Sequence, residues 1–232
     1  MKKLLALALC AGLFTTAKSQ KVYLQGGVNL ANISTSNSGA TEKNNVLTTF
    51  NVGIMARSNA SEPIALEAGL LLDGRGAKAN TYTTSSTDDN YIKSKFNPLY
   101  LEIPVNLIVR MPLQNKSNIF VNAGPYIAMG IGGKSKVETK FLGTVSNSSN
   151  DIEFNNDNPT TTQQEDASYD KLKRFDYGVN LGAGFDLGKI LLKANYGLGL
   201  AKINSTQTNN SSNDKNKYRT VSISVGIPIG GK

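Results

Sequence analysis

Histidine is absent from the 232-residue chain, and its absence excludes several kinds of chemistry. Hydrolysis by a Ser-His-Asp triad needs an imidazole as the general base, and the common catalytic zinc sites need imidazole as a ligand. We therefore expect no catalytic residues, no metal site and no cofactor.

Long apolar runs are also scarce, and the one of note lies at the N-terminus. Leu4–Phe14 follows the basic stretch Met1–Lys3 and precedes Ala17–Ser19, which has the small-x-small pattern of a secretory cleavage site. The run is too short for a transmembrane helix, which needs about 20 residues. We predict that residues 1–19 form a cleaved signal peptide and that Gln20 begins the mature protein. A buried N-terminal helix is the alternative.

Cysteine occurs once, at Cys10 within the predicted signal peptide. The mature protein would therefore have neither a thiol nor a disulfide, and a cysteine metal site is excluded. A lipoprotein signal would require a small residue before the cysteine, whereas Leu9 occupies that position.

The charge of the chain is moderately basic, at +8, and loss of Lys2, Lys3 and Lys18 with the signal peptide would leave +5. The excess is spread over many segments and forms no dense Lys/Arg stripe, so we expect no nucleic-acid partner. After Phe14 no segment approaches 18 consecutive apolar residues, which argues against a transmembrane helix.

Hydrophobic residues alternate with polar ones along much of the chain. From Leu99 to Arg110, every odd position is aliphatic, which places these side chains on one face of a strand. Counting this one, the alternation recurs in eight stretches: residues 22–30, 49–57, 64–73, 99–110, 119–132, 174–186, 190–200 and 220–229. A slightly negative mean hydropathy fits such strands, because only every second residue would face lipid.

The connections between the predicted strands alternate in length. Short ones fall near residues 57–62, 111–118 and 187–189, and long polar ones near residues 34–45, 76–90, 134–171 and 204–217. Short turns at one end and long loops at the other are typical of outer-membrane barrels. We predict an all-β fold: an eight-stranded antiparallel up-and-down transmembrane barrel over residues 20–232, monomeric, surrounded by outer-membrane lipid, with external long loops and periplasmic termini.

The polar face of these strands distinguishes a membrane barrel from a soluble one. A soluble barrel of the lipocalin type would point its apolar face inward. Here the apolar face is nearly free of charge, while the polar face is rich in glycine and carries balanced charges. This balance suits a confined interior in which opposite charges pair. The predicted interior network comprises Arg57, Arg75, Arg110, Arg174 and Lys193 with Glu67, Asp73, Glu102, Asp176 and Asp186.

Three motifs resemble those of a known family. Asn97–Pro104 contains Y-L-E-I-P, Ala123–Tyr126 contains G-P-Y, and Asp176–Gly184 has the pattern D-x-G-x-x-x-G-x-G. Together they resemble the PorT-like outer-membrane β-barrel family of Bacteroidetes, which shares the small-barrel architecture of OmpA and OmpX. Gln20 after a cleavage site is also common there. The resemblance covers the whole mature chain.

The resemblance implies a porin-like barrel of the cell envelope but little about activity. The founding branch takes part in a secretion and gliding apparatus, and no motif here selects that branch. The chain departs from most barrels at its end, Ile227–Lys232, where an aromatic terminal residue is usual. Barrel enzymes that act on lipid A or phospholipids usually use a histidine paired with serine or aspartate. We therefore predict a non-enzymatic protein.

Two other patterns could carry chemistry. Gly130–Ser135 is glycine-rich and ends in Lys-Ser, but a phosphate-binding loop would require glycine at Ala128, so we interpret it as part of a strand. Glu67 and Glu102 face inward on neighbouring strands and could act as an acid–base pair. No sugar-binding aromatic groove accompanies them, and we interpret them as salt-bridge partners of Arg110 or Lys193.

The connection at residues 134–171 is the longest and has an acidic second half. It is a candidate site for a divalent cation or a basic partner; the alternative is a solvated loop without a specific role. The acidic residues are Asp151, Glu153, Asp157, Glu165, Asp166 and Asp170. We expect this loop to be external and to be removable, from Lys136 to Asp170, without loss of the barrel.

Two functions are compatible with the sequence. One is a structural or interaction barrel whose external loops engage an envelope protein or a surface ligand. The other is a small transport pore, and a role as an accessory component of the secretion apparatus is a further alternative. Eight strands enclose an interior that side chains just fill, so we favour the interaction barrel.

Overall fold

The computed structural model describes residues 21–37, 40–43, 46–58, 63–82, 90–113, 117–154, 171–203 and 216–229. The predicted signal peptide lies outside these residues. None of the described residues belongs to a helix long and apolar enough to cross a membrane. The described strands are β1 (Lys21–Asn37), β2 (Ala40–Lys43), β3 (Leu47–Arg57), β4 (Ile64–Gly74), β5 (Ala77–Tyr82), β6 (Tyr91–Pro112), β7 (Asn118–Phe141), β8 (Thr144–Asp151), β9 (Glu153–Phe154), β10 (Lys171–Leu172), β11 (Phe175–Asp186), β12 (Leu191–Gly199) and β13 (Lys217–Pro228).

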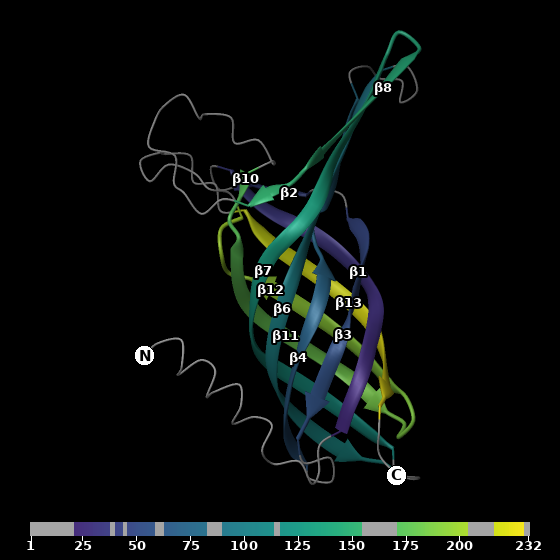
Figure 1. Ribbon diagram of the computed structural model, residues 1–232, viewed down its shortest axis with the longest axis vertical. Coiled ribbons are helices and arrows are strands. Elements are labelled where there is room, and N and C mark those ends of the chain that lie inside the picture. The colour runs from purple at the N-terminus through teal and green to yellow at the C-terminus, as the bar shows by residue number, and fades with distance from the viewer. Residues whose placement is uncertain are drawn as a thin grey trace.

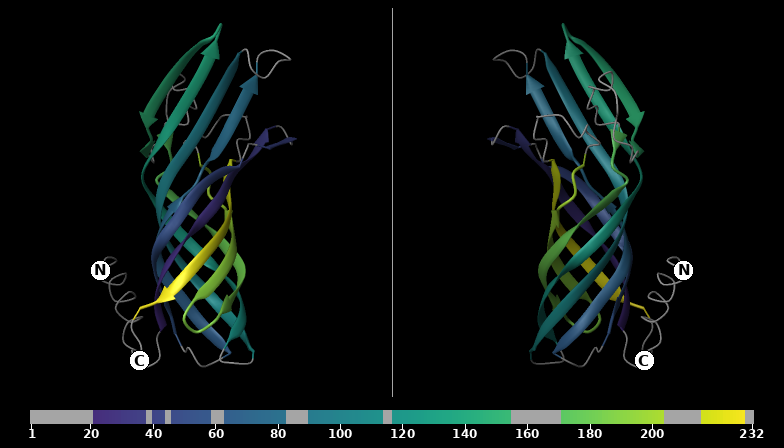
Figure 2. Two further views of the ribbon diagram at one scale, coloured as in Figure 1. Left: turned by 90° about the vertical axis from the view of Figure 1, so that its right-hand side faces the viewer. Right: turned by 90° about the vertical axis from the view of Figure 1, so that its left-hand side faces the viewer.

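Antiparallel pairing joins the long strands into a barrel-type sheet (Figures 1 and 2). The pairs run from β1 to β13, β12, β11, β7, β6, β4 and β3, and β3 pairs with β1 again. Each of these strands therefore has a partner on both sides, which is what a hydrocarbon environment demands of the backbone. Tyr23 lies opposite Pro228, so the start of β1 and the end of β13 are at the same end of the barrel.

The two faces of the sheet differ as the alternation predicts. On β6, Ile103, Val105 and Leu107 are between 40% and 48% exposed, whereas Glu102 and Asn106 are 5% exposed or less. The other barrel strands carry similarly exposed apolar side chains: Leu24, Val28, Phe50, Val52, Ile54, Leu66, Leu70, Val121, Ile127, Leu181, Phe185, Leu192, Val221, Ile223, Val225 and Ile227. Soluble proteins rarely expose a continuous apolar surface of this extent. A soluble barrel is therefore excluded, and this surface faces lipid.

Each alternating stretch of the sequence lies on one of the strands of this sheet, but several strands continue further than the alternation. β6 has 22 residues and β7 has 24, whereas a membrane-spanning strand needs about 9–11. Beyond the barrel, β5 pairs with β6 and β8 pairs with β7. β5 and β8, with the ends of β6 and β7 that they pair with, form a sheet that projects from one end of the molecule (Figures 1 and 2). We call it the projecting sheet.

Three of the connections predicted as long polar loops contain strands. β5 lies within residues 76–90, β8 within 134–171, and β2, which pairs with the end of β1, within 34–45. These short strands could not be predicted from the sequence because they are mostly polar on both faces, so they lack the alternation that marks a half-buried strand. In residues 204–217, only the last two lie within the described part of the chain.

An arginine on the apolar face should destabilise the protein according to its depth. Val105→Arg, near the middle of the part of β6 that belongs to the barrel, is expected to lower the free energy of unfolding by roughly 2–4 kcal/mol, because a cation would be placed in the middle of the hydrocarbon layer. Met111→Arg, at the end of β6 and also exposed, should lower it by about 0–1 kcal/mol. Urea unfolding in lipid vesicles measures both. Equal losses would contradict the assignment of the lipid-facing surface.

Candidate functional site

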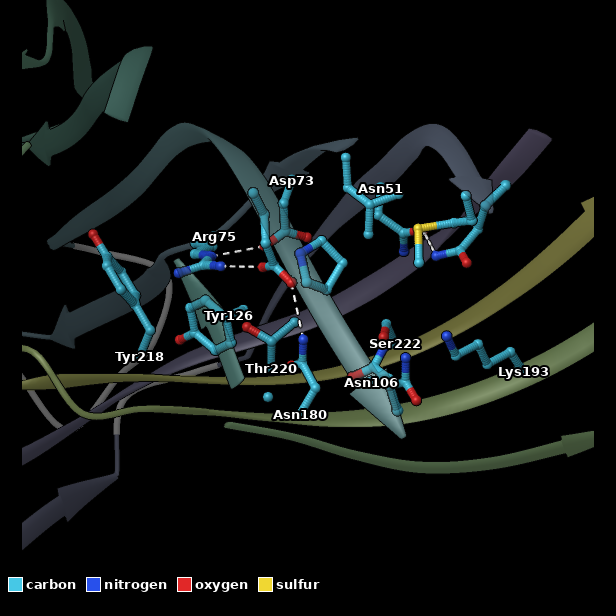
Figure 3. A pocket seen from close by; sticks show the side chains of 17 residues that line it. Asn51, Asp73, Arg75, Asn106, Tyr126, Asn180, Lys193, Tyr218, Thr220 and Ser222 are labelled. Atoms are coloured by element: carbon cyan, nitrogen blue, oxygen red, sulfur yellow. Dashed lines mark hydrogen bonds and ion pairs between the residues drawn. The ribbon is translucent and has the colours of Figure 1, made fainter. Parts of the chain in front are cut away.

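The interior of the barrel contains two ion networks with a small cavity between them. Figure 3 shows this region, with Arg75 and Asp73 at one end of the cavity and Lys193 at the other. We call the two groups the Glu67 network and the Arg75 network. The long strands bring them together, because every second residue of each strand points inward.

Glu67 is the centre of the first network and is fully buried. Its Oε2 accepts hydrogen bonds from Arg57 Nη2 at 2.6 Å, Arg57 Nε at 3.0 Å and Tyr23 Oη at 2.6 Å. Lys193 Nζ donates to Oε1. The Arg57 guanidinium also lies over the Phe120 ring, 4.4 Å from its centroid. One carboxylate therefore holds two cations from opposite parts of the sheet.

The second network is centred on Arg75, which is also buried. Its Nε donates to Asp73 Oδ2 at 2.7 Å, and its two terminal nitrogens donate to Asp176 and Glu102. The guanidinium thus links β6, β11 and the end of β4. Tyr126 packs against it, with the ring centroid 4.8 Å from Arg75 Cζ.

Neutral donors complete the coordination of the three carboxylates. Asn29 Nδ2 donates to Asp73 at 2.6 Å, Asn180 Nδ2 to Glu102 at 2.9 Å, and Tyr126 Oη to Asp176 at 2.9 Å. The charged residues could be predicted from the sequence, whereas these donors could not. The balance of charges on the polar face predicts that the charged side chains form ion pairs. The partners of inward-facing Asn and Tyr side chains can be assigned only when the strand register is known.

A small polar cavity separates the networks. Its volume is about 40 Å³, which has room for only a few water molecules. Gln25, Asn106 and Asn195 line it with amide groups, and Met55 and Leu71 narrow it. A cavity of this size is too small to hold a solute larger than water.

An apolar cap lies in the mouth of the barrel, above the Arg75 network. Ile152 and Leu172 are buried there, and Phe154 packs against the same cluster, with its ring 5.5 Å from that of Tyr100. β9 and β10, which carry two of these residues, form a two-stranded parallel sheet. A side chain at Gly130 would collide with the Phe154 ring, since an added Cβ would lie 2.1 Å from it.

The cap argues against the prediction that residues 136–170 can be removed without loss of the barrel, which stays a prediction. Ile152 and Phe154 lie in that range and fill its mouth, so their removal would expose the apolar cluster beneath them. No sequence pattern predicts the cap, because two isolated apolar residues in a polar segment show no periodicity.

The structure places nine of the ten predicted network residues in buried positions. The exception is Arg174, which is exposed and precedes β11. The alternation that we extended to it begins one residue later, at Phe175, so it does not point into the barrel. Arg110 is buried, but the ion pairs of Glu67 are with Arg57 and Lys193.

The acidic segment lies only partly within the described residues. Asp151 and Glu153 are exposed, and Asp151 is 3.9 Å from Lys134. In the described ranges, no three acidic, cysteine or histidine residues are grouped so that they could hold a metal ion. The other four residues, Asp157, Glu165, Asp166 and Asp170, lie outside these ranges.

Removal of Arg75 should be far more damaging than removal of Lys193. In Arg75→Met, three buried carboxylates lose their guanidinium at once, and we expect a loss of about 3–5 kcal/mol in the free energy of unfolding. In Lys193→Met, Glu67 keeps Arg57 and Tyr23, and the loss should be about 1–3 kcal/mol. Urea unfolding followed by gel mobility of unboiled samples compares the two. Similar losses of stability in the two variants would mean that Arg75 does not hold the Arg75 network together.

Comparison with known proteins places this geometry in a family. Residues 18–205 match the family described as outer membrane protein beta-barrel domain. No curated protein matches. Among solved structures, the attachment invasion locus protein Ail of Yersinia pestis is 12% identical with a TM-score of 0.40, covering 91% of this chain and 99% of Ail. The structure of Ail in complex with the heparin analogue sucrose octasulfate is 10% identical with a TM-score of 0.41, and the coverage of both chains is the same.

Neisserial surface protein A is 14% identical with a TM-score of 0.39, covering 90% of this chain and 97% of that protein. Similarities this low say nothing about function. The family match spans most of the chain and agrees with the apolar outer surface of the sheet. The chain belongs to the outer-membrane β-barrel family, and it is a protein of the outer membrane.

Proposed function

We propose that this protein is a non-enzymatic interaction barrel: an eight-stranded transmembrane barrel that anchors an external sheet, through which it engages an envelope protein or a surface ligand. The observation that carries this proposal is the length of β6 and β7, which have 22 and 24 residues. A membrane needs about half of that length. The remainder builds a sheet in water that the barrel itself does not require.

The orientation of the sheet supports an external role. It projects from the end of the barrel opposite to the start of β1 and the end of β13 (Figure 1). In outer-membrane barrels, the short turns are periplasmic and the long connections are external. A cleaved signal peptide at residues 1–19 and membership of the PorT-like branch are part of this proposal, and both rest on the sequence.

The filled interior argues against a transport pore. Two ion networks, a cavity of about 40 Å³ and an apolar cap lie in series along the barrel. Reconstituted into a planar bilayer, the protein should show no stepwise conductance, because buried ion networks and apolar side chains occupy the interior. Regular channel steps would favour the pore instead.

The end of β7 and β8 form a hairpin within the projecting sheet, and this hairpin can be shortened without changing the residues of the cap. Lys136 and Ser149 lie opposite each other on β7 and β8, so replacement of residues 137–148 by Asn-Gly leaves a pair joined by a tight two-residue turn. We expect this variant to insert into the outer membrane and to migrate faster unboiled than boiled, as closed barrels do. Partners that co-purify with the wild-type protein from native outer membranes should be lost.

A matched variant tests the cap instead. Deletion of the longer segment 136–170 also removes Ile152 and Phe154, and the barrel should become less stable. If the short deletion retains every partner, the sheet is not the interaction surface. If it abolishes the gel-mobility shift, the hairpin is needed for folding and the barrel is not an independent anchor.

A further inference from the structure

One row of side chains on the projecting sheet contains three lysines and no acid. Lys78 on β5 lies opposite Lys95 on β6, and Lys95 lies opposite Lys136 on β7. Neighbouring strands are about 4.8 Å apart, so three ammonium groups stand side by side across the sheet. We call these residues the basic row. Like charges directly opposite each other destabilise a sheet.

The rows on either side of the basic row contain acids. Lys93 is 3.8 Å from Glu138, and Lys134 is 3.9 Å from Asp151. The basic row instead continues to Ser149 on β8. Within the described part of the chain, no carboxylate forms an ion pair with Lys78, Lys95 or Lys136. Anionic groups from outside the protein would relieve the repulsion.

An open groove runs over this part of the sheet. Its volume is about 450 Å³, which is within the range of sites that bind small molecules. Lys78, Lys93, Lys95 and Lys136 line it, and Glu138 is the acid among the lining residues. The groove therefore carries a net positive charge and is large enough for a phosphorylated sugar.

The basic row lies on the lipid-facing side of the molecule. Phe96 is buried in the mouth of the barrel, so its neighbour Lys95 points outward, as Leu99 and Ile103 do further along β6. From Leu99 to Lys95 is about 14 Å along the strand, or about 10 Å in height at a tilt of about 40°. A lysine side chain can extend back over about 6 Å of that height, towards the membrane surface.

We propose that the basic row binds the phosphate groups of an anionic glycolipid in the outer leaflet of the outer membrane. Lysine suits this ligand, because its compact ammonium group has three rotatable donors that can donate to phosphate oxygens in many orientations. The apolar band directly beneath would hold the acyl chains of the same lipid. This inference rests on the proposed orientation, with the projecting sheet outside the cell, and it names a ligand that the interaction barrel would bind.

The test compares lipids that differ only in phosphate. Full-length protein in detergent is titrated with bisphosphorylated lipid A or with its dephosphorylated form, and bound lipid is counted by native mass spectrometry. We expect tight binding of the phosphorylated lipid alone. The triple variant K78Q/K95Q/K136Q should bind it on the order of 100-fold more weakly. The control K173Q/K189Q/K202Q, with the same change of charge elsewhere, should bind as the wild type does.

The free energy of unfolding is measured as a second test, in case the triple variant folds less well in detergent. Without lipid, the triple variant should be at least as stable as the wild type, because the repulsion within the row is gone. Phosphorylated lipid should stabilise the wild type and not the variant.

Three outcomes would overturn the proposal: equal binding of both lipids, equal binding by the triple variant, or tighter binding of soluble dextran sulfate than of the lipid. The last would show that the row takes a polymer rather than a lipid. The hairpin-shortened variant keeps all three lysines. Loss of its partners with retained lipid binding, or the reverse, separates this proposal from the proposed function.

Discussion

Satisfaction of the backbone hydrogen bonds inside lipid is the constraint on which this structure depends. In hydrocarbon, an unpaired N–H or C=O group has no water to bond, so a sheet must leave no free edge. The pairing of β6 with β7 and of β1 with β13 meets that demand. Once the sheet closes, every second side chain must face lipid and the others must share a narrow interior. The apolar outer band and the polar core are both consequences.

That interior is too narrow to leave its charges in water, so the charges are paired. The two networks pair them in different ways. Glu67 collects two cations, whereas Arg75 collects three carboxylates. Each centre ties together strands that are not neighbours, so the networks fix the cross-section of the barrel. With the Ile152, Phe154 and Leu172 cap above them, they leave little space for a solute. The surface available to a partner is then the outside, above all the projecting sheet.

The barrel itself could be predicted from the sequence because its strands are half-buried, and half-burial imposes a period of two that residues such as Leu99–Arg110 display. The choice of Arg57, Arg75, Glu67 and Glu102 as interior charges followed from the same period. The projecting strands have water on both faces and show no period, so β5 and β8 were expected as loops. The central place of Arg75 in its network depends on its contact with Asp176 on β11, 101 residues away in the chain. No local sequence pattern predicts such a contact.

The most direct test of this account is the accessibility of single cysteines along β6. The mature chain would contain no cysteine of its own, so substitutions at Ile103, Val105 and Leu107 can be compared with substitutions at Asn106 and Ile108. In lipid vesicles, nitroxide labels at the first three sites should collide with dissolved oxygen and not with a water-soluble nickel chelate. Labels at the other two should be protected from both. Access of the chelate to Asn106 and Ile108 would reveal an open pore, and its access to the first three sites would contradict a lipid-facing surface.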